Sequence, residues 1–275
     1  MKKKKIAMKI FNIVFGAIVL MIVVFPIYMM ISNSFKPTLI IRSNPPKFLF
    51  KPTLLHYEKI IKQGGFLGYF GNSFIVASIA TFVSVALGSL AAYGLAIMKS
   101  KWGNKISNFL IFSKLVPTIT IMIPLYVLLD KAGLLGTYVG PILAHVSLNA
   151  PFVTWLVLGF IRDIPNELFE SGKLDGCNRI QVFWKVILPL LKPAIGSSIL
   201  LVMQFSWNEL MYAMQYTNIN TYTLTVGISK FVGAISVDWG QSSAAATIVM
   251  LPIILVGFIL QKYMVSGLTA GAVKG

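Results

Sequence analysis

Long apolar runs separated by short polar connections limit what this chain can fold into. A helix needs about 20 consecutive apolar residues to cross the hydrocarbon core of a bilayer. Six stretches approach or exceed this length: 10–31, 69–98, 106–129, 138–160, 186–213 and 242–260. Helices satisfy their own backbone hydrogen bonds in lipid, where no water replaces them. The pattern therefore predicts an all-α, polytopic membrane bundle of about six transmembrane helices.

Composition supports a membrane protein and argues against a soluble one. Of the 275 residues, 56% are hydrophobic and only 12% are charged, whereas soluble domains carry about 25% charged residues. The net charge of +16 raises the alternative of a nucleic-acid-binding protein. However, the basic residues lie between apolar runs rather than on one soluble face, so we predict no nucleic-acid partner. The one cysteine, Cys177, excludes an intrachain disulfide and a multi-cysteine metal site.

The basic residues predict the orientation in the cell membrane. Five lysines precede the first apolar run, and basic residues are enriched in the connections assigned to the cytoplasm. We expect both termini in the cytoplasm. A cleaved signal peptide is the alternative for the first run, but that run is long for one and no typical cleavage site follows. The basic segment 33–68 runs against this tendency, while the remaining connections agree with one another.

Four parts follow from this topology. Residues 1–32 form an N-terminal segment with the first transmembrane helix, and residues 33–68 an extracytoplasmic segment with a short helix near 54–63. Residues 69–264 form a core of five further transmembrane helices, and 265–275 a cytoplasmic tail. Small side chains recur every fourth residue in the second helix, which favours close packing of helix backbones: Ala80, Ser84, Gly88, Ala92 and Ala96. Pro117 and Pro124 are expected to interrupt the third helix.

The most polar connection of the core, residues 163–193, contains or borders half of the 8 acidic residues. We expect two short helices joined by a turn. Asp163 is the expected N-cap of the first helix, and Gly176 suits its left-handed end. Asn178 and Gln181 have the spacing of a capping box that starts the second.

The first short helix is predicted to be amphipathic. Ile164, Leu168 and Phe169 form an apolar stripe, while Glu167 and Glu170 face elsewhere. Such a helix is typical of a surface that presses sideways against a partner. The alternative is an ordinary charged cytoplasmic loop.

The same segment resembles the EAA loop of ABC importer permeases. Glu170-Ser171-Gly172, Gly176 and Val186-Ile187-Leu188-Pro189 match its pattern, with small departures at Ser171, Gly172 and Val186. In that family the loop is a coupling helix that docks into a cleft on an ATP-binding subunit. The resemblance implies that the ATPase-coupling residues are Glu167, Glu170, Ser171, Gly172, Asp175, Gly176, Leu188 and Pro189.

A polar cluster in the fifth apolar run is a candidate solute path. Its members are Gln204, Trp207, Asn208, Glu209 and Tyr212. A carboxylate at mid-bilayer costs about 2.5–3.5 kcal/mol, so Glu209 needs a partner or water. Gln204, Asn208 and Tyr212 have helical spacing, which suggests one shared face lining a sugar path. The alternative is a hydrogen-bonded helix interface.

Further motifs resemble the MalG-type permeases of carbohydrate ABC importers. They are Pro117, Pro124-Leu125-Tyr126, Trp155, Gly159-Phe160, Ile164-Pro165, Trp207-Asn208-Glu209 and the ending Ser266 to Gly275. The resemblance implies a permease subunit that forms half of a translocation path. Its implied partners are a MalF-like second permease, two ATP-binding cassette subunits and an extracytoplasmic sugar-binding protein. ATP would be bound and hydrolysed by those partner subunits, with no cofactor on this chain.

No catalytic set is visible in the sequence. A Walker-type glycine loop is absent, the two histidines are far apart in the sequence, and no cluster has metal-ligand spacing. We therefore predict a non-catalytic transport subunit without a metal. Alternatives are an ABC permease for a peptide, phosphate or amino acid, and a secondary transporter. The internal repeats expected of many secondary transporters are not seen.

Overall fold

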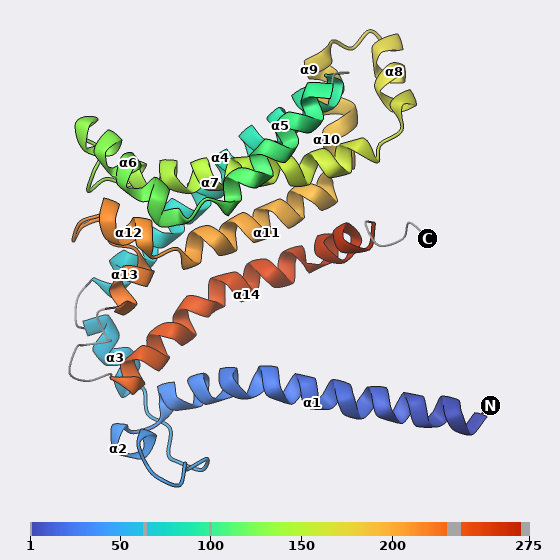
Figure 1. Ribbon diagram of the computed structural model, residues 1–275. Helices are drawn as coiled ribbons and strands as arrows, with labels where there is room; N and C mark the ends of the chain where they lie inside the picture. Colours follow the sequence, from blue (N-terminus) through green and yellow to red (C-terminus); the bar gives the residue numbers. More distant parts are fainter. Residues whose placement is uncertain (1, 63–64, 99–100, 230–237, 271–275) are drawn as a thin grey trace. The chain divides into compact units, whose positions relative to one another are not determined.

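The computed structural model describes residues 2–62, 65–98, 101–229 and 238–270. Within these ranges all regular secondary structure is helical (Figure 1). Four helices are long and apolar enough to cross a membrane, and counting two bent helix pairs as one span each gives six. This confirms the predicted all-α bundle.

The chain divides into two compact units, of which unit 1 comprises Met1–Leu67 and Ile228–Leu251. It contains α1 (Lys2–Phe35), α2 (Thr38–Ile41), α3 (Leu55–Lys62) and the first part of α14 (Trp239–Ala270). Helix α3 confirms the predicted short helix near 54–63. It is tied to the end of α1, where the Ser34 and Tyr57 hydroxyls lie 2.8 Å apart and Nε2 of the buried His56 lies 2.9 Å from the Lys36 carbonyl oxygen.

Unit 2 comprises Gly68–Gly227 and Pro252–Gly275 and contains most of the predicted core. Its long helices are α4 (Phe66–Ile97), α7 (Val139–Arg162) and α11 (Lys192–Asn208). The shorter elements are α5 (Lys101–Phe112), a 3-10 turn (Ser113–Leu115), α6 (Thr118–Lys131), α8 (Asn166–Leu174), α9 (Arg179–Val182), a π-helical turn (Phe183–Ile187), α10 (Leu188–Leu190), α12 (Met211–Tyr216) and α13 (Leu224–Ser229). The predicted tail lies partly in α14, and its last five residues lie outside the described ranges.

The third predicted helix is broken once, not twice. Its two parts, Lys105–Leu115 and Thr118–Lys131, meet at an angle of 94°. Pro117, which has no backbone N–H, directly precedes α6 and marks the break. Pro124 was also expected to interrupt this span, but it lies inside the continuous helix α6. Membrane helices tolerate such prolines where their neighbours satisfy the freed carbonyl group.

The fifth predicted helix ends five residues earlier than the apolar pattern indicated. Helix α11 stops at Asn208, and the backbone is extended at Glu209, with φ −72° and ψ 129°. The Glu209 carboxylate then accepts hydrogen bonds from the backbone N–H groups of Tyr212 (2.9 Å) and Ala213 (3.1 Å). The prediction of one helix over 186–213 was therefore wrong: this carboxylate caps a separate helix, α12, and near the start of the span Arg179–Leu190 meets Lys192–Asn208 at an angle of 78°.

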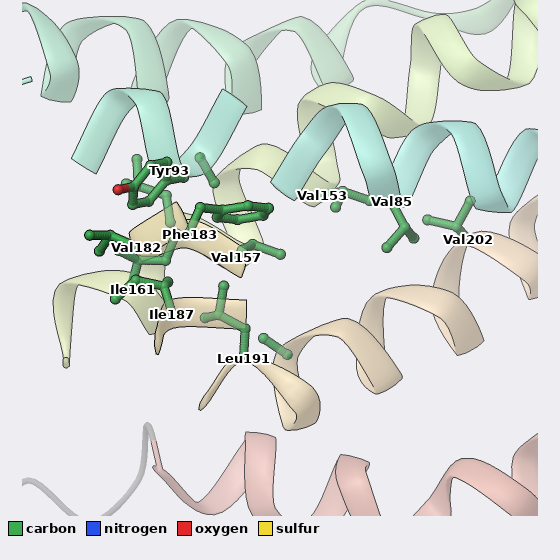
Figure 2. Close-up of a cluster of buried hydrophobic side chains, with 13 residues drawn as sticks. Val85, Tyr93, Val153, Val157, Ile161, Val182, Phe183, Ile187, Leu191 and Val202 are labelled. Carbon is green, nitrogen blue, oxygen red and sulfur yellow. The ribbon is translucent and has the colours of Figure 1, made fainter. Parts of the chain in front are cut away.

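One buried apolar cluster joins the long helices of unit 2 to the 163–193 connection (Figure 2). Helix α4 contributes Tyr93, α7 contributes Val157 and Ile161, and the π-helical turn contributes Phe183 and Ile187. Such side chains lose contact with lipid or water only if the helices and the connection fold together. The cluster therefore fixes the connection onto the bundle.

The ridge of small residues on α4 forms a close helix contact, as predicted. Ala80, Ser84, Gly88 and Ala92 are all buried. A Cβ atom added at Gly88 would lie 2.6 Å from the Cβ of Val153 on α7, whereas one added at Gly94 would meet nothing within 4 Å. Only a glycine at position 88 permits this approach of α4 and α7.

These two glycines provide a matched test of the packing. We predict that Gly88→Ala lowers the stability of the folded chain by about 1–3 kcal/mol, because the added methyl group overpacks the α4–α7 contact. Gly94→Ala adds the same group to the same helix in open space and should leave stability nearly unchanged. Thermal unfolding of both purified variants in detergent measures the difference, and equal melting temperatures would contradict the close contact.

Candidate functional site

Helix α8 lies beyond the end of α7, next to α9, at one end of unit 2 (Figure 1). Asp163 was expected to cap it, but Asp163 instead follows the last residue of α7, and the N-cap of α8 is Pro165. The reason is the extended backbone of Pro165, with φ −56° and ψ 138°, after which the helix starts at Asn166. The predicted first short helix therefore exists, with a later beginning.

The inner face of α8 is narrow and closely packed. The ring of Phe169 stacks on that of Tyr93, with 6.4 Å between centroids and 7° between planes. Gly172 is buried, and an added Cβ would lie 3.2 Å from a methyl carbon of Val182 and 3.3 Å from one of Val186. The Tyr93 hydroxyl also donates to the Arg179 carbonyl oxygen at 2.8 Å. These contacts seat α8 on the bundle.

The outer face of α8 combines carboxylates with exposed apolar side chains. Glu167, Glu170 and Asp175 are exposed, as is Ser171. Leu168, placed by the sequence in the apolar stripe with Ile164 and Phe169, is 38% exposed, while those two pack against the core.

An exposed leucine on this face was missed by the sequence analysis. Leu174 is 88% exposed at the end of α8. The sequence signal that could have identified Leu174 was its position beside charged residues in the predicted short helix. Of the other predicted coupling residues, Leu188 is half-buried and Pro189 is exposed, and both belong to α10.

The turn after α8 has the predicted geometry. Gly176 has φ +79°, a left-handed conformation that favours glycine. Its N–H donates to the Lys173 carbonyl oxygen at 3.0 Å, which closes the helix end. Asn178 and Gln181 exchange two hydrogen bonds, each of 2.9 Å, and so form the predicted capping box.

The candidate solute-path residues do not share one face. Gln204 and Asn208 are exposed on the same side of α11, and the Asn208 amide donates to the Gln204 carbonyl oxygen at 3.0 Å. Trp207 is buried against the ring of Phe70, with 5.7 Å between centroids. Tyr212 is buried on α12, with 5.3 Å between the centroids of its ring and that of Tyr216. The expected alignment of Gln204, Asn208 and Tyr212 fails because α11 ends before Tyr212.

Glu209 has the partners that its position requires. Besides capping α12, its carboxylate lies 3.4 Å from Nε2 of His145 on α7. The His145 side chain is only 2% exposed and that of Glu209 15%. The pair therefore joins α7 to the end of α11.

A lysine inside the third span is a polar feature that the sequence analysis missed. Lys114 lies in the 3-10 turn at the break, and its Nζ donates to Oδ1 of Asn149 on α7 at 3.3 Å. The same Nζ lies 5.2 Å from the ring centroid of Phe152 and 5.1 Å from that of Phe205. A lone basic residue within the apolar run 106–129 was the signal available.

The described residues do not bring three or more His, Cys, Asp or Glu side chains together in a group able to hold a metal ion. What the structure does offer is an exposed face on α8 and polar groups on spanning helices. These features define a multi-pass helical membrane protein with an exposed helix seated at one end of its bundle.

Comparison with known proteins identifies the class more closely. Residues 84–269 match the model of the family described as the binding-protein-dependent transport system inner membrane component. The chain therefore belongs to this family of permease subunits, which are non-catalytic components of ABC importers in the cell membrane.

Two relatives match over nearly their whole length. The trehalose/maltose transport system permease protein MalG of Thermococcus litoralis is 34% identical over 270 residues, covering 96% of each chain. The diacetylchitobiose uptake system permease protein DasC of Streptomyces coelicolor is 34% identical and covers 94% of this chain and 95% of its own.

A solved structure has the same fold. A chain of a bacterial ABC transporter that imports the acidic polysaccharide alginate superimposes with a TM-score of 0.78, covering 93% of this chain and 95% of its own at 23% identity.

The capping box is open to a direct test. We predict that Asn178→Ala destabilises the start of α9 by about 1 kcal/mol, because the Gln181 N–H loses its acceptor. Asn178→Ser retains a capping oxygen and serves as the control. Hydrogen exchange of residues 179–187, followed by mass spectrometry, should accelerate about fivefold in the alanine variant only. Equal exchange in the two variants would show that the box contributes nothing.

Proposed function

We propose that this chain is a permease subunit of an ATP-driven sugar importer and forms half of its translocation path. The observation that carries the proposal is α8, a short helix whose inner face is fixed to the bundle and whose outer face is exposed. The sugars in the names of the two relatives support sugar over a peptide, phosphate or amino acid.

The exposed face of α8 docks into a cleft on an ATP-binding subunit. Its carboxylates supply polar contacts, and Leu168 and Leu174 supply apolar area that binding would bury. The contact face therefore consists of Glu167, Leu168, Glu170, Ser171, Leu174, Asp175 and Gly176. In this arrangement the α8 end of unit 2 and both chain termini face the cytoplasm.

Coupling requires that α8 transmits force without bending. Its ring contact with Tyr93 and the close approach at Gly172 tie it to α4 and to the π-helical turn. Closure of the ATPase dimer would then move α8 and the spanning helices as one body, and so alternate the access of the path. This chain binds no cofactor itself, and ATP belongs to two partner subunits.

The remaining partners follow from the same proposal. A MalF-like second permease completes the translocation path, and an extracytoplasmic sugar-binding protein delivers the solute. On this chain Gln204 and Asn208 are the path residues, because they present amide groups on the exposed side of α11. Trp207, Glu209 and Tyr212 support them through packing and capping.

The turn at Gly176 tests whether α8 transmits force from the ATPase to the spanning helices. We predict that Gly176→Val reduces sugar uptake at least tenfold while membrane insertion persists, because a β-branched residue is strained at φ +79°. Gly176→Asn tolerates this conformation and should retain most of the uptake. Reconstituted vesicles with the complete importer provide the measurement, and normal uptake by the valine variant would count strongly against coupling through α8.

The charge on α8 tests the docking. We predict that Glu170→Lys weakens co-purification of the ATP-binding subunit and lowers ATP turnover several-fold. The reason is that a positive charge replaces the carboxylate that contacts this subunit, so the attraction becomes a repulsion. Asp130→Lys makes the same charge change at an exposed site on α6 and should have little effect. Unchanged co-purification and turnover in the Glu170 variant would remove this contact from the proposal.

A further inference from the structure

Lys114 carries a charge that the described part of the chain does not neutralise. It sits at the break between α5 and α6, inside the bent pair that counts as one span. Its Nζ bonds to the neutral amide of Asn149 and faces two phenylalanine rings. No carboxylate of the described residues lies within 4.0 Å of this Nζ.

A lysine in this position needs an aqueous or anionic environment. A charged side chain at the centre of a bilayer costs about 2.5–3.5 kcal/mol or more, so such residues face the bundle interior or a water-filled cavity. The hydrogen bond that Lys114 donates to Asn149 and the contacts with the two rings compensate only part of this cost. Lys114 is half-buried, so part of this residue remains accessible at the break.

Aromatic and amide side chains are exposed on the helices that Lys114 contacts. Phe205 is 53% exposed on α11, and its chain neighbour Gln204 is exposed as well. On α7, Trp155 is 41% exposed and stacks on Phe152, with 6.5 Å between ring centroids. Amides, aromatic faces and an ammonium together are groups that bind saccharides, because rings stack on the C–H faces of sugars and polar groups bond to their hydroxyls.

The polar groups behind this surface hold Lys114 in place. Asn149 is buried, and while its Oδ1 accepts from Lys114, its Nδ2 donates to the Ser206 hydroxyl at 3.5 Å. This connects the break of the third span to α7 and α11.

We propose that Lys114 lines the translocation path and contacts the solute, and that its ammonium favours saccharides carrying an anionic group, such as a carboxylate. The saccharide part of this inference rests on the proposed function, whereas the position of a positive charge in the path does not. The competing arrangement is a carboxylate of the second permease that pairs with Lys114 away from the path.

The first experiment measures the charge directly. The complete importer is reconstituted in vesicles with Cys177→Ser, which removes the only cysteine of this chain, and Gln204→Cys is added as a reporter. Its labelling rates are measured with an anionic sulfonatoethyl and a cationic trimethylammonioethyl methanethiosulfonate. We expect the ratio of anionic to cationic rates to fall about fivefold or more when Lys114→Met is introduced. An unchanged ratio overturns the proposal.

Accessibility provides the second readout and a control. Lys114→Cys should react with both reagents, whereas Phe82→Cys, at an apolar side chain that is 75% exposed on α4, should not. If Lys114→Cys is as unreactive as the control, the proposal is overturned and the pairing of Lys114 with the second permease is favoured. Should Lys114→Met fail to assemble, Lys114→Gln replaces it, because it retains a hydrogen-bond donor for Asn149.

Protection by saccharides tests the preference for an anionic group. Maltobionate, which differs from maltose by a carboxylate on an opened ring, should slow labelling of Gln204→Cys more than maltose does, and Lys114→Met should remove the difference. Equal protection by the two overturns the anionic preference. Sugar uptake is measured on vesicles whose importer carries only Cys177→Ser: if that uptake fails while the charge-dependent labelling persists, the sugar function is wrong and the path position of Lys114 stands.

Discussion

Backbone hydrogen bonding in lipid is the constraint on which the whole structure depends. Wherever a span is interrupted, the freed N–H and C=O groups need partners from the protein itself. The chain meets this need at the end of α11, where the Glu209 carboxylate accepts from two N–H groups of α12 and also lies beside His145. A residue that is costly in a membrane thereby makes an irregular backbone possible.

Packing then links the irregular segments to one another. The cluster around Tyr93 and Phe183 includes side chains from α4, α7 and the π-helical turn (Figure 2). Helix α8 packs against this cluster through Phe169. The same long helix α7 carries Asn149, which holds Lys114. The exposed helix at one end of unit 2 and the polar groups within the spans are thus connected by a single continuous element.

Sequence alone predicted the spans, the ridge on α4, the turn at Gly176 and the capping box, because each follows from local chemistry or a regular repeat. It did not locate the end of α11, because hydropathy continues past Asn208 while the capping by Glu209 depends on residues brought together by folding. Trp207 and Tyr212 have the chemistry of sugar-binding residues, yet burial decides what their rings touch. Lys114 was overlooked because its significance comes from α7 and α11, which lie distant in sequence.

The π-helical turn at Phe183–Ile187 has a consequence for how such chains can change during evolution. A π turn accommodates an additional residue within a helix, and Phe183 and Ile187 at its two ends are both buried. Removing one residue would rotate everything before it by about 100° about the helix axis. Substitutions in this stretch are therefore far easier to accommodate than insertions or deletions. Evolution should conserve the number of residues here more strictly than their identities.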